Sequence, residues 1–286
     1  MASPVLIAGA GGMLGTALRT VCAHRGLEVV APDEAAFDIT SIESVRRVVG
    51  AFASANPGAV LVNAAAYTNV DRAEDEPQRA FLVNEYGAAL LAEAASEKGL
   101  RFVHVSTDFV FDGKKAGAYS EVDETNPLSI YGSSKLAGEW AVEAADPRAL
   151  IVRTAWVFGP GGVNFPTKIL DRAAQHDKIQ VVSDEVGSPT YTIDLAEGLL
   201  RLADVGAQGL FHLAGSGWCS RDEMAAEILH AAGRGNVEIE SVPSSTFPAK
   251  AARPANSVLD CAKAGALGVL MPVWRDSLAR FIGSLS

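Results

Sequence analysis

Short apolar runs alternate with amphipathic stretches through the first two thirds of the chain. Each apolar run has the length and residue types of a buried strand, and each amphipathic stretch has the apolar spacing of a helix. This alternation predicts an α/β fold of the Rossmann type, in which helices cover both faces of a doubly wound parallel sheet. The strands are expected at residues 4–8, 27–31, 59–62, 101–105, 149–153, 179–182 and 209–215.

The last third of the chain is less regular, with the patterns of two helices and one strand between long loops. We therefore expect a Rossmann domain made of residues 1–158 and 176–214. Residues 159–175 and 215–286 are expected to form a small C-terminal α/β domain that closes over the sheet edge.

A glycine-rich turn follows the first predicted strand and opens a helix. Gly9, Gly12 and Gly15 have the spacing GxxGxxG, which lets backbone N–H groups and a helix N-terminus approach a pyrophosphate. Glycine turns are common, but this position directly after a buried strand favours a dinucleotide site. Asp33 follows the second strand, where an acidic residue can hold the adenosine ribose, although a plain loop carboxylate fits the position equally well. Asp38 is expected on the rim of the sheet, near an adenine ring.

Small and polar residues follow the next two strands. The alanines 64–66 leave room for a flat cofactor against the backbone, or serve only to pack a strand tightly on a helix. Thr107 and Asp108 follow the fourth strand, and ligands of doubly wound sheets gather at the carboxyl ends of strands. These two residues are therefore expected in the binding crevice. The long loop 113–127 suits a segment that faces the substrate.

Tyr131 and Lys135 lie four residues apart in a stretch that reads as helix, so their side chains project from one face. An ammonium beside a phenol favours the phenolate. Lowering the pKa of a tyrosine from about 10 to about 7 requires roughly 4 kcal/mol, which a lysine, a cationic cofactor ring and partial burial can jointly supply. Such a tyrosine can exchange a proton near neutral pH. The same spacing arises by chance in many helices, so the pair alone does not establish catalysis.

Composition narrows the class of protein. A formal charge of −10 and a pI near 5.0 argue against a general nucleic-acid or anionic membrane surface. The start of the chain lacks the pattern of a signal peptide, and no apolar run approaches the ~20 residues of a membrane span. We expect a soluble cytoplasmic protein that binds no membrane. Neither the three cysteines nor the five histidines have the spacing of a metal site.

Taken together, these residues resemble a known family over nearly the whole chain. The glycine turn, Thr107 and the Tyr131/Lys135 pair have the pattern of extended short-chain dehydrogenases/reductases. Six further blocks, in the same order, resemble dTDP-4-dehydrorhamnose reductases. The blocks are Asn63–Asp71, Ser106–Phe111, Tyr131–Glu139, Arg153–Phe158, Gly187–Thr190 and Arg253–Ser257.

The resemblance implies that the C4 ketone of dTDP-4-dehydro-β-L-rhamnose is reduced with NADPH or NADH. By this resemblance Tyr131 is the proton donor, Lys135 lowers its pKa and binds the nicotinamide ribose, and Thr107 assists at the same oxygen. The cofactor is expected at Gly9, Gly12, Met13, Leu14, Gly15, Asp33, Asp38, Ile39, Ala64, Ala65, Ala66, Tyr67, Val105, Tyr131 and Lys135. The dTDP-sugar is expected at Thr107, Asp108, Val70, Trp156, Asn164 and Arg253, with Asn164 and Arg253 near the diphosphate.

At two places the sequence departs from the pattern of related enzymes, and each departure bears on the expected chemistry. Phe109 stands where the related dehydratases carry a glutamate, so dehydration is disfavoured and a plain ketoreductase remains. Thr16, Ala17 and Leu18 offer no carboxylate at the place where some family members help a Mg²⁺ ion bridge a dimer, so we expect no metal.

Several alternatives stay open from the sequence. Another dTDP-4-keto-6-deoxysugar could be the substrate, and the regulatory subunit of methionine adenosyltransferase resembles the same family without known turnover. Asp33 leans toward NADH because a carboxylate repels a 2′-phosphate, although Arg19 or Arg25 could compensate. The protein is expected to be a monomer or a homodimer.

Overall fold

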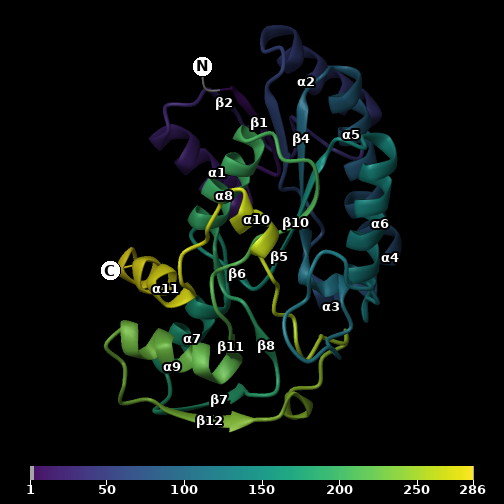
Figure 1. The fold of residues 1–286 in the computed structure, drawn as a ribbon. Helices are drawn as coiled ribbons and strands as arrows, with labels where there is room; N and C mark the ends of the chain where they lie inside the picture. The colour runs from purple at the N-terminus through teal and green to yellow at the C-terminus, as the bar shows by residue number, and fades with distance from the viewer. Residues whose placement is uncertain (1–2, 286) are drawn as a thin grey trace.

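A computed structural model describes residues 3–285 of the chain. Its centre is a parallel sheet of six strands in the order β10-β5-β4-β3-β1-β2 (Figure 1). Order and direction confirm the Rossmann-type architecture expected from the alternation of strands and helices. The strands are β1 (Val5–Ala8), β2 (Val29–Val30), β3 (Val60–Asn63), β4 (Arg101–Thr107), β5 (Leu150–Thr154) and β10 (Gly209–His212).

Helices cover both faces of this sheet (Figure 1). On one face lie α1 (Met13–His24) and α8 (Thr192–Asp204), joined by the short α10 (Ala262–Ala266) beside β10. On the other face lie α2 (Ile42–Ala55), α5 (Ala88–Glu97) and α6 (Ile130–Ala145). Each face has its own buried apolar cluster, because β-branched and apolar residues of the strands point alternately to the two sides.

The helical segment before β4 is not a single regular helix. It begins with α3 (Val70–Ala73) and α4 (Pro77–Phe81), continues as a π-helical turn at Leu82–Gly87, and ends in α5. The π-helical turn contains Asn84, whose side chain is buried. Such turns are rare and often occur at functional sites.

A second group of elements, which we call the outer cluster, packs below the carboxyl edge of the sheet (Figure 1). It contains α7 (Phe165–Ala173), α9 (Arg221–Ala231), α11 (Trp274–Gly283) and the parallel pair β7 (Lys178–Val182) and β12 (Glu238–Val242). Short pairs complete it: β6 (Val157–Phe158) with β9 (Thr190–Tyr191), and β8 (Val186–Gly187) with β11 (Cys219–Ser220).

One expectation from the sequence needs correction. The strand expected at 179–182 does not join the central sheet, because β7 pairs with β12 and its apolar residues Ile179 and Val181 enter the outer cluster. Residues 176–187 therefore pack with the outer cluster, whereas Ala264 and Val269, placed in the small domain, pack against the central sheet. The partner strand β12 lies far along the chain from β7, so no local sequence pattern indicates this pairing.

Within residues 3–285, every helix is too short or too polar to cross a lipid bilayer.

Candidate active site

The glycine turn after β1 owes its shape to contacts that exclude a side chain. Gly9 has a φ of +80°, and a Cβ there would collide with the backbone of Ala64 and Ala65. A Cβ at Gly15 would collide with the carbonyl oxygen of Gly9, so α1 could not pack this close to the strand. Gly9 and Gly15 thus hold the N-terminus of α1 directly above the end of β1.

The rim of this turn is open where a dinucleotide phosphate is expected. Gly12 is the N-cap of α1, is exposed, and would meet only Gly9 O, 3.6 Å away, if it carried a Cβ. No side chain caps the first turn of α1, so its N–H groups are available to an anion. This geometry fits the pyrophosphate of a nicotinamide dinucleotide.

Backbone at the end of β3 is fixed by two buried asparagines. Asn63 Oδ1 accepts a hydrogen bond from Ala65 N at 3.1 Å. Asn84 Oδ1 accepts from Tyr67 N at 2.8 Å, and Asn84 Nδ2 donates to Ser134 Oγ at 2.9 Å. Asn84 therefore connects the segment after β3 to α6.

The two acidic candidates for the adenosine end have local partners. Asp33 Oδ1 accepts from Ala36 N at 2.8 Å, and Asp38 Oδ1 accepts from Thr40 N at 2.8 Å. Both side chains remain exposed, and Asp38 lines an open groove of about 1010 Å³. Carboxylates dominate the charge of this groove, which is lined by Glu34, Ala35, Asp38, Thr40, Asp75, Glu76, Gln78, Arg79, Leu82 and Val83.

Tyr131 and Lys135 lie on the first turns of α6, where Ser129 caps the helix by accepting from Gly132 N at 3.1 Å. Lys135 is buried and its Nζ donates to Val105 O at 2.7 Å. The Tyr131 ring packs edge-on against Phe109, with ring centroids 5.5 Å apart. The helix thus carries both residues near the carboxyl end of β4, whereas their spacing had predicted only that they share one helix face.

The pKa of Tyr131 is raised in the structure, whereas the sequence led us to expect a lowered one. Burial raises the pKa of Tyr131 to about 12, with a smaller rise from the Asp108 charge, while the Thr107 hydroxyl acts in the opposite direction. Burial also lowers the pKa of Lys135 to about 8, against the charge of Glu139. Desolvation outweighs the effect of the Thr107 hydroxyl, so the chain's own residues do not make Tyr131 more acidic.

Thr107 and Asp108 lie where β4 ends in a single 3-10 turn. Thr107 Oγ1 accepts from Phe109 N at 3.2 Å and donates to Asp108 Oδ1 at 3.0 Å. Burial raises the pKa of the Asp108 carboxyl to about 6, and the hydroxyls of Ser257 and Thr107 oppose that rise. Asp108 Oδ2 is buried and has no hydrogen-bond partner within residues 3–285, so it can still bind a polar group.

Trp156 has a φ of 45°, a left-handed conformation that is strained for a bulky residue. Its indole lies over Gly187, where a Cβ would collide with the ring. The guanidinium carbon of Arg221 lies 3.4 Å from the centre of the indole. Sequence reasoning missed Arg221, because only the fold brings the start of α9 to Trp156.

Two of the other predicted substrate residues form hydrogen bonds within the chain. Arg253 Nη2 donates to Asp71 Oδ2 at 2.8 Å, and its Nη1 donates to Asp71 Oδ1 at 3.3 Å. Asn164 caps α7 and donates to Gly159 O at 2.8 Å. Val70, the first residue of α3, is half-buried beside Asp71.

A buried ion pair beneath α6 also escaped sequence reasoning. Arg153 Nη2 and Nε donate to the Glu139 carboxylate at 2.6 and 2.9 Å, and Ser106 Oγ donates to the same group. Glu139 is one helical turn from Lys135, so this negative charge lies close to the buried ammonium. The signal was present, since Glu139 and Arg153 both fall in blocks that resemble the family.

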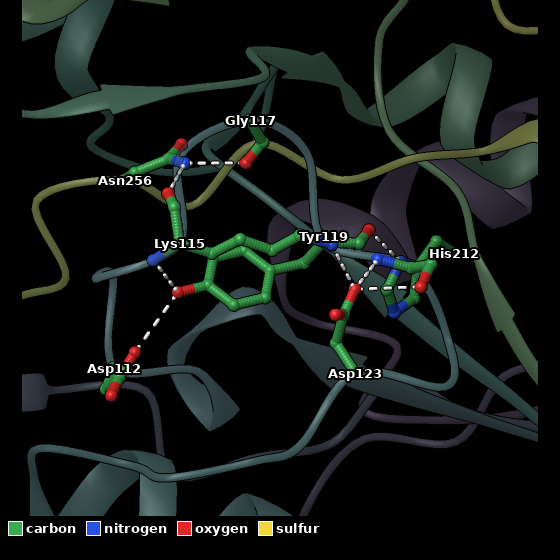
Figure 2. A network of polar contacts seen from close by, with 8 residues as sticks. Asp112, Lys115, Gly117, Tyr119, Asp123, His212 and Asn256 are labelled. Carbon is green, nitrogen blue, oxygen red and sulfur yellow. Dashed lines mark hydrogen bonds and ion pairs between the residues drawn. The ribbon is translucent and has the colours of Figure 1, made fainter.

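The loop predicted to face the substrate is tied down by polar contacts (Figure 2). Tyr119 OH donates to Asp112 Oδ1 at 3.1 Å, and Asn256 Nδ2 donates to Gly117 O at 2.7 Å. His212 Nδ1 lies 3.0 Å from Tyr119 O, which links the loop to the end of β10. The loop is therefore held between the sheet and the segment that contains Asn256.

Among residues 3–285, no group of three or more histidine, cysteine or acidic side chains is arranged to hold a metal ion.

Comparisons with known proteins agree over the full chain. The family model of the RmlD substrate binding domain matches residues 3–286. A dTDP-4-dehydrorhamnose reductase of Mycobacterium tuberculosis is 42% identical over 283 residues, with 96% of this chain and 91% of the relative covered. The crystal structure of such a reductase from Clostridium acetobutylicum has a TM-score of 0.94 at 36% identity and covers 99% of both chains. One from Bacillus anthracis, in complex with NADP, has a TM-score of 0.94 at 35% identity, with 99% of this chain and 100% of that chain covered.

Proposed function

Because this chain belongs to the dTDP-4-dehydrorhamnose reductase family, we propose that it reduces the C4 ketone of dTDP-4-dehydro-β-L-rhamnose to give dTDP-β-L-rhamnose. The reductant is NADPH or NADH, in keeping with the NADP complex of the Bacillus anthracis relative. Bound at the glycine turn, the reduced nicotinamide supplies the hydride that the ketone carbon accepts.

Tyr131 supplies the proton. As C4 is reduced, negative charge develops on the ketone oxygen, and a positioned acid must neutralise it. A pKa of about 12 keeps Tyr131 protonated throughout the neutral range, so the residue enters the reaction as a phenol. Thr107 has one hydroxyl proton, which it donates to Asp108 Oδ1 at 3.0 Å, and turning that proton toward the substrate lets it share the hydrogen bond to the developing alkoxide.

Lys135 contributes the positive charge of its buried ammonium. Its Nζ donates to Val105 O at 2.7 Å, which fixes the ammonium at the end of β4, where the ribose of the nicotinamide is expected. A positive charge there stabilises the phenolate that remains once Tyr131 has given up its proton. The charge of Glu139 raises the pKa of Lys135 and so helps the buried ammonium to keep its proton.

Asp108 and Trp156 are proposed to bind the sugar. The free carboxylate oxygen of Asp108 can accept from a sugar hydroxyl, and the indole of Trp156 offers a flat face. Phe109 lies beside Tyr131 without an acidic group, which supports reduction over dehydration.

The cofactor residues named from the sequence remain proposals, as do the two-domain division, the cytoplasmic location and the monomeric or homodimeric state.

The observation that carries this proposal is the meeting of Thr107, Tyr131 and Lys135 at the end of β4, in a chain that matches the reductases along its length. The test is to mix the protein with NADPH or NADH and dTDP-4-dehydro-L-rhamnose and to follow the absorbance of the reduced nicotinamide. Absence of decay with both cofactors, in a protein shown to be folded, would refute the function.

Tyr131→Phe tests the proton donor. We expect turnover to fall by about 100-fold or more, because general acid catalysis is lost, while cofactor affinity stays within a few-fold. Tyr86→Phe is the control, since Tyr86 is exposed on the π-helical turn. Wild-type turnover in Tyr131→Phe would exclude this residue as the acid.

A further inference from the structure

The proposed substrate carries a diphosphate, and a group with this charge needs positively charged or N–H partners in the site. The residues suggested for it by the sequence are engaged elsewhere. Arg253 forms a two-pronged ion pair with Asp71, and Asn164 is the N-cap of α7. A further donor near the sugar, such as a guanidinium, would meet this need.

Arg221, the first residue of α9, has the contacts expected of such a cation. Its guanidinium carbon lies 3.4 Å from the centre of the Trp156 ring and 5.2 Å from that of Phe165. Its Nε lies 3.5 Å from Glu185 Oε2, but in the described part of the chain neither terminal nitrogen donates a hydrogen bond. With 21% of its side chain exposed, the residue is accessible from solvent.

Arg221 also lies within range of the charge of Asp108, the neighbour of Thr107. Burial lowers the pKa of Arg221, and the charges of Glu185 and Asp108 act in the opposite direction.

We propose that Arg221 binds the diphosphate of the nucleotide sugar, and that Trp156 and Glu185 hold its guanidinium in place for this contact. The inference rests on the proposed function, because that function supplies the diphosphate. A guanidinium presents donors in a planar fork that matches two phosphate oxygens. When the guanidinium stacks on the indole, the N–H donors at its edge stay free to bind phosphate. Because Trp156 and Glu185 already hold the side chain, less conformational entropy is lost when the ligand binds.

The test compares the binding of dTDP and of thymidine by calorimetry in the full-length protein. In Arg221→Gln the affinity for dTDP should fall about 10- to 100-fold, because a charge-assisted contact is lost, while thymidine affinity stays within about twofold. Arg221→Lys should retain part of the dTDP affinity, since it keeps the charge but not the fork.

Arg275→Gln is the matched control. Arg275 also stacks on a tryptophan, with 4.4 Å to the centre of the Trp274 ring, and its Nε lies 3.3 Å from Glu227 Oε2. It lies on α11, so its loss should leave dTDP affinity unchanged. An equal loss of dTDP and thymidine affinity in Arg221→Gln would overturn the proposal, because it would indicate a displaced Trp156. So would an unchanged affinity for dTDP.

These measurements need no turnover. If the wild-type protein binds dTDP through Arg221 but oxidises neither NADPH nor NADH with dTDP-4-dehydro-L-rhamnose, the proposed function fails and the assignment of Arg221 stands. If turnover occurs but the affinity for dTDP does not depend on Arg221, the proposed function stands and the assignment of Arg221 fails.

Discussion

Lys135 shows how a catalytic residue can act against the stability of the fold. The ammonium is 2% exposed and makes one hydrogen bond, to Val105 O. A lysine whose pKa is lowered to about 8 by burial destabilises the folded state wherever it is charged. That penalty is fully present below pH 8 and disappears above the ordinary pKa of 10.5.

Lys135→Met should therefore abolish turnover and stabilise the protein. The buried charge is removed, while Val105 O loses a partner, so we expect a net gain of about 1 kcal/mol in the free energy of unfolding at pH 7. Urea unfolding of both proteins at pH 7 and at pH 10 measures it, and the difference should shrink at the higher pH. A variant less stable than wild type at pH 7 would contradict this account.

At the scale of single elements, α6 is placed by glycines rather than by its apolar face alone. A Cβ at Gly132 would collide with Phe109 O, and one at Gly138 would collide with Asn84 O. The first glycine lets α6 approach the turn after β4, and the second lets it approach the π-helical turn. Both contacts keep Tyr131 and Lys135 at the sheet edge.

Gly138→Ala should lower the free energy of unfolding by about 2 kcal/mol or more, because the backbone of Asn84 has to move to admit the methyl group. Thermal unfolding measures the loss, and turnover should fall with it. Gly50→Ala in α2 is the control: no atom lies within 4 Å of its added Cβ, so the better helix former should stabilise by about 0.5–1 kcal/mol. Equal stabilisation by both substitutions would contradict this account of α6.

The sequence was most informative about elements whose cause is local. The spacing of Tyr131 and Lys135 and the glycine turn follow from period and position, and the structure places them as expected. The π-helical turn around Asn84 has no local signal, because it depends on what packs against it. Arg221 and the Glu139–Arg153 pair depend in the same way on contacts between distant segments.

At the scale of the whole molecule, buried neutral histidines make stability depend on pH. Burial lowers the pKa of His212 to about 4 and that of His104 well below its ordinary 6.5. An unfolded chain takes up these protons near pH 6.5 and the folded chain does so only at lower pH, so stability is complete above 6.5 and is lost as pH falls toward 4.

For His212 we expect the free energy of unfolding to fall by about 3 kcal/mol between pH 6.5 and 4, at about 1.4 kcal/mol for each pKa unit, and His104 acts in the same direction. His212→Asn should reduce this slope, since an amide can still donate to Tyr119 O but does not titrate. Urea unfolding across this pH range provides the measurement. An identical slope in the variant would show that His212 is not one of the groups responsible.

The path of the chain through the outer cluster affects how such a protein can change its substrate. Its apolar centre draws on three separate stretches, around α7 to β9, β11 to β12, and α11, with returns to the central sheet at α8 and α10. No single crossover between two related genes can exchange this part alone, because a breakpoint that transfers all three stretches also transfers α8, β10 and α10, which pack with the central sheet. New sugar preferences should therefore arise by point substitution along the inner face, at positions such as Trp156 and Arg221, rather than by shuffling.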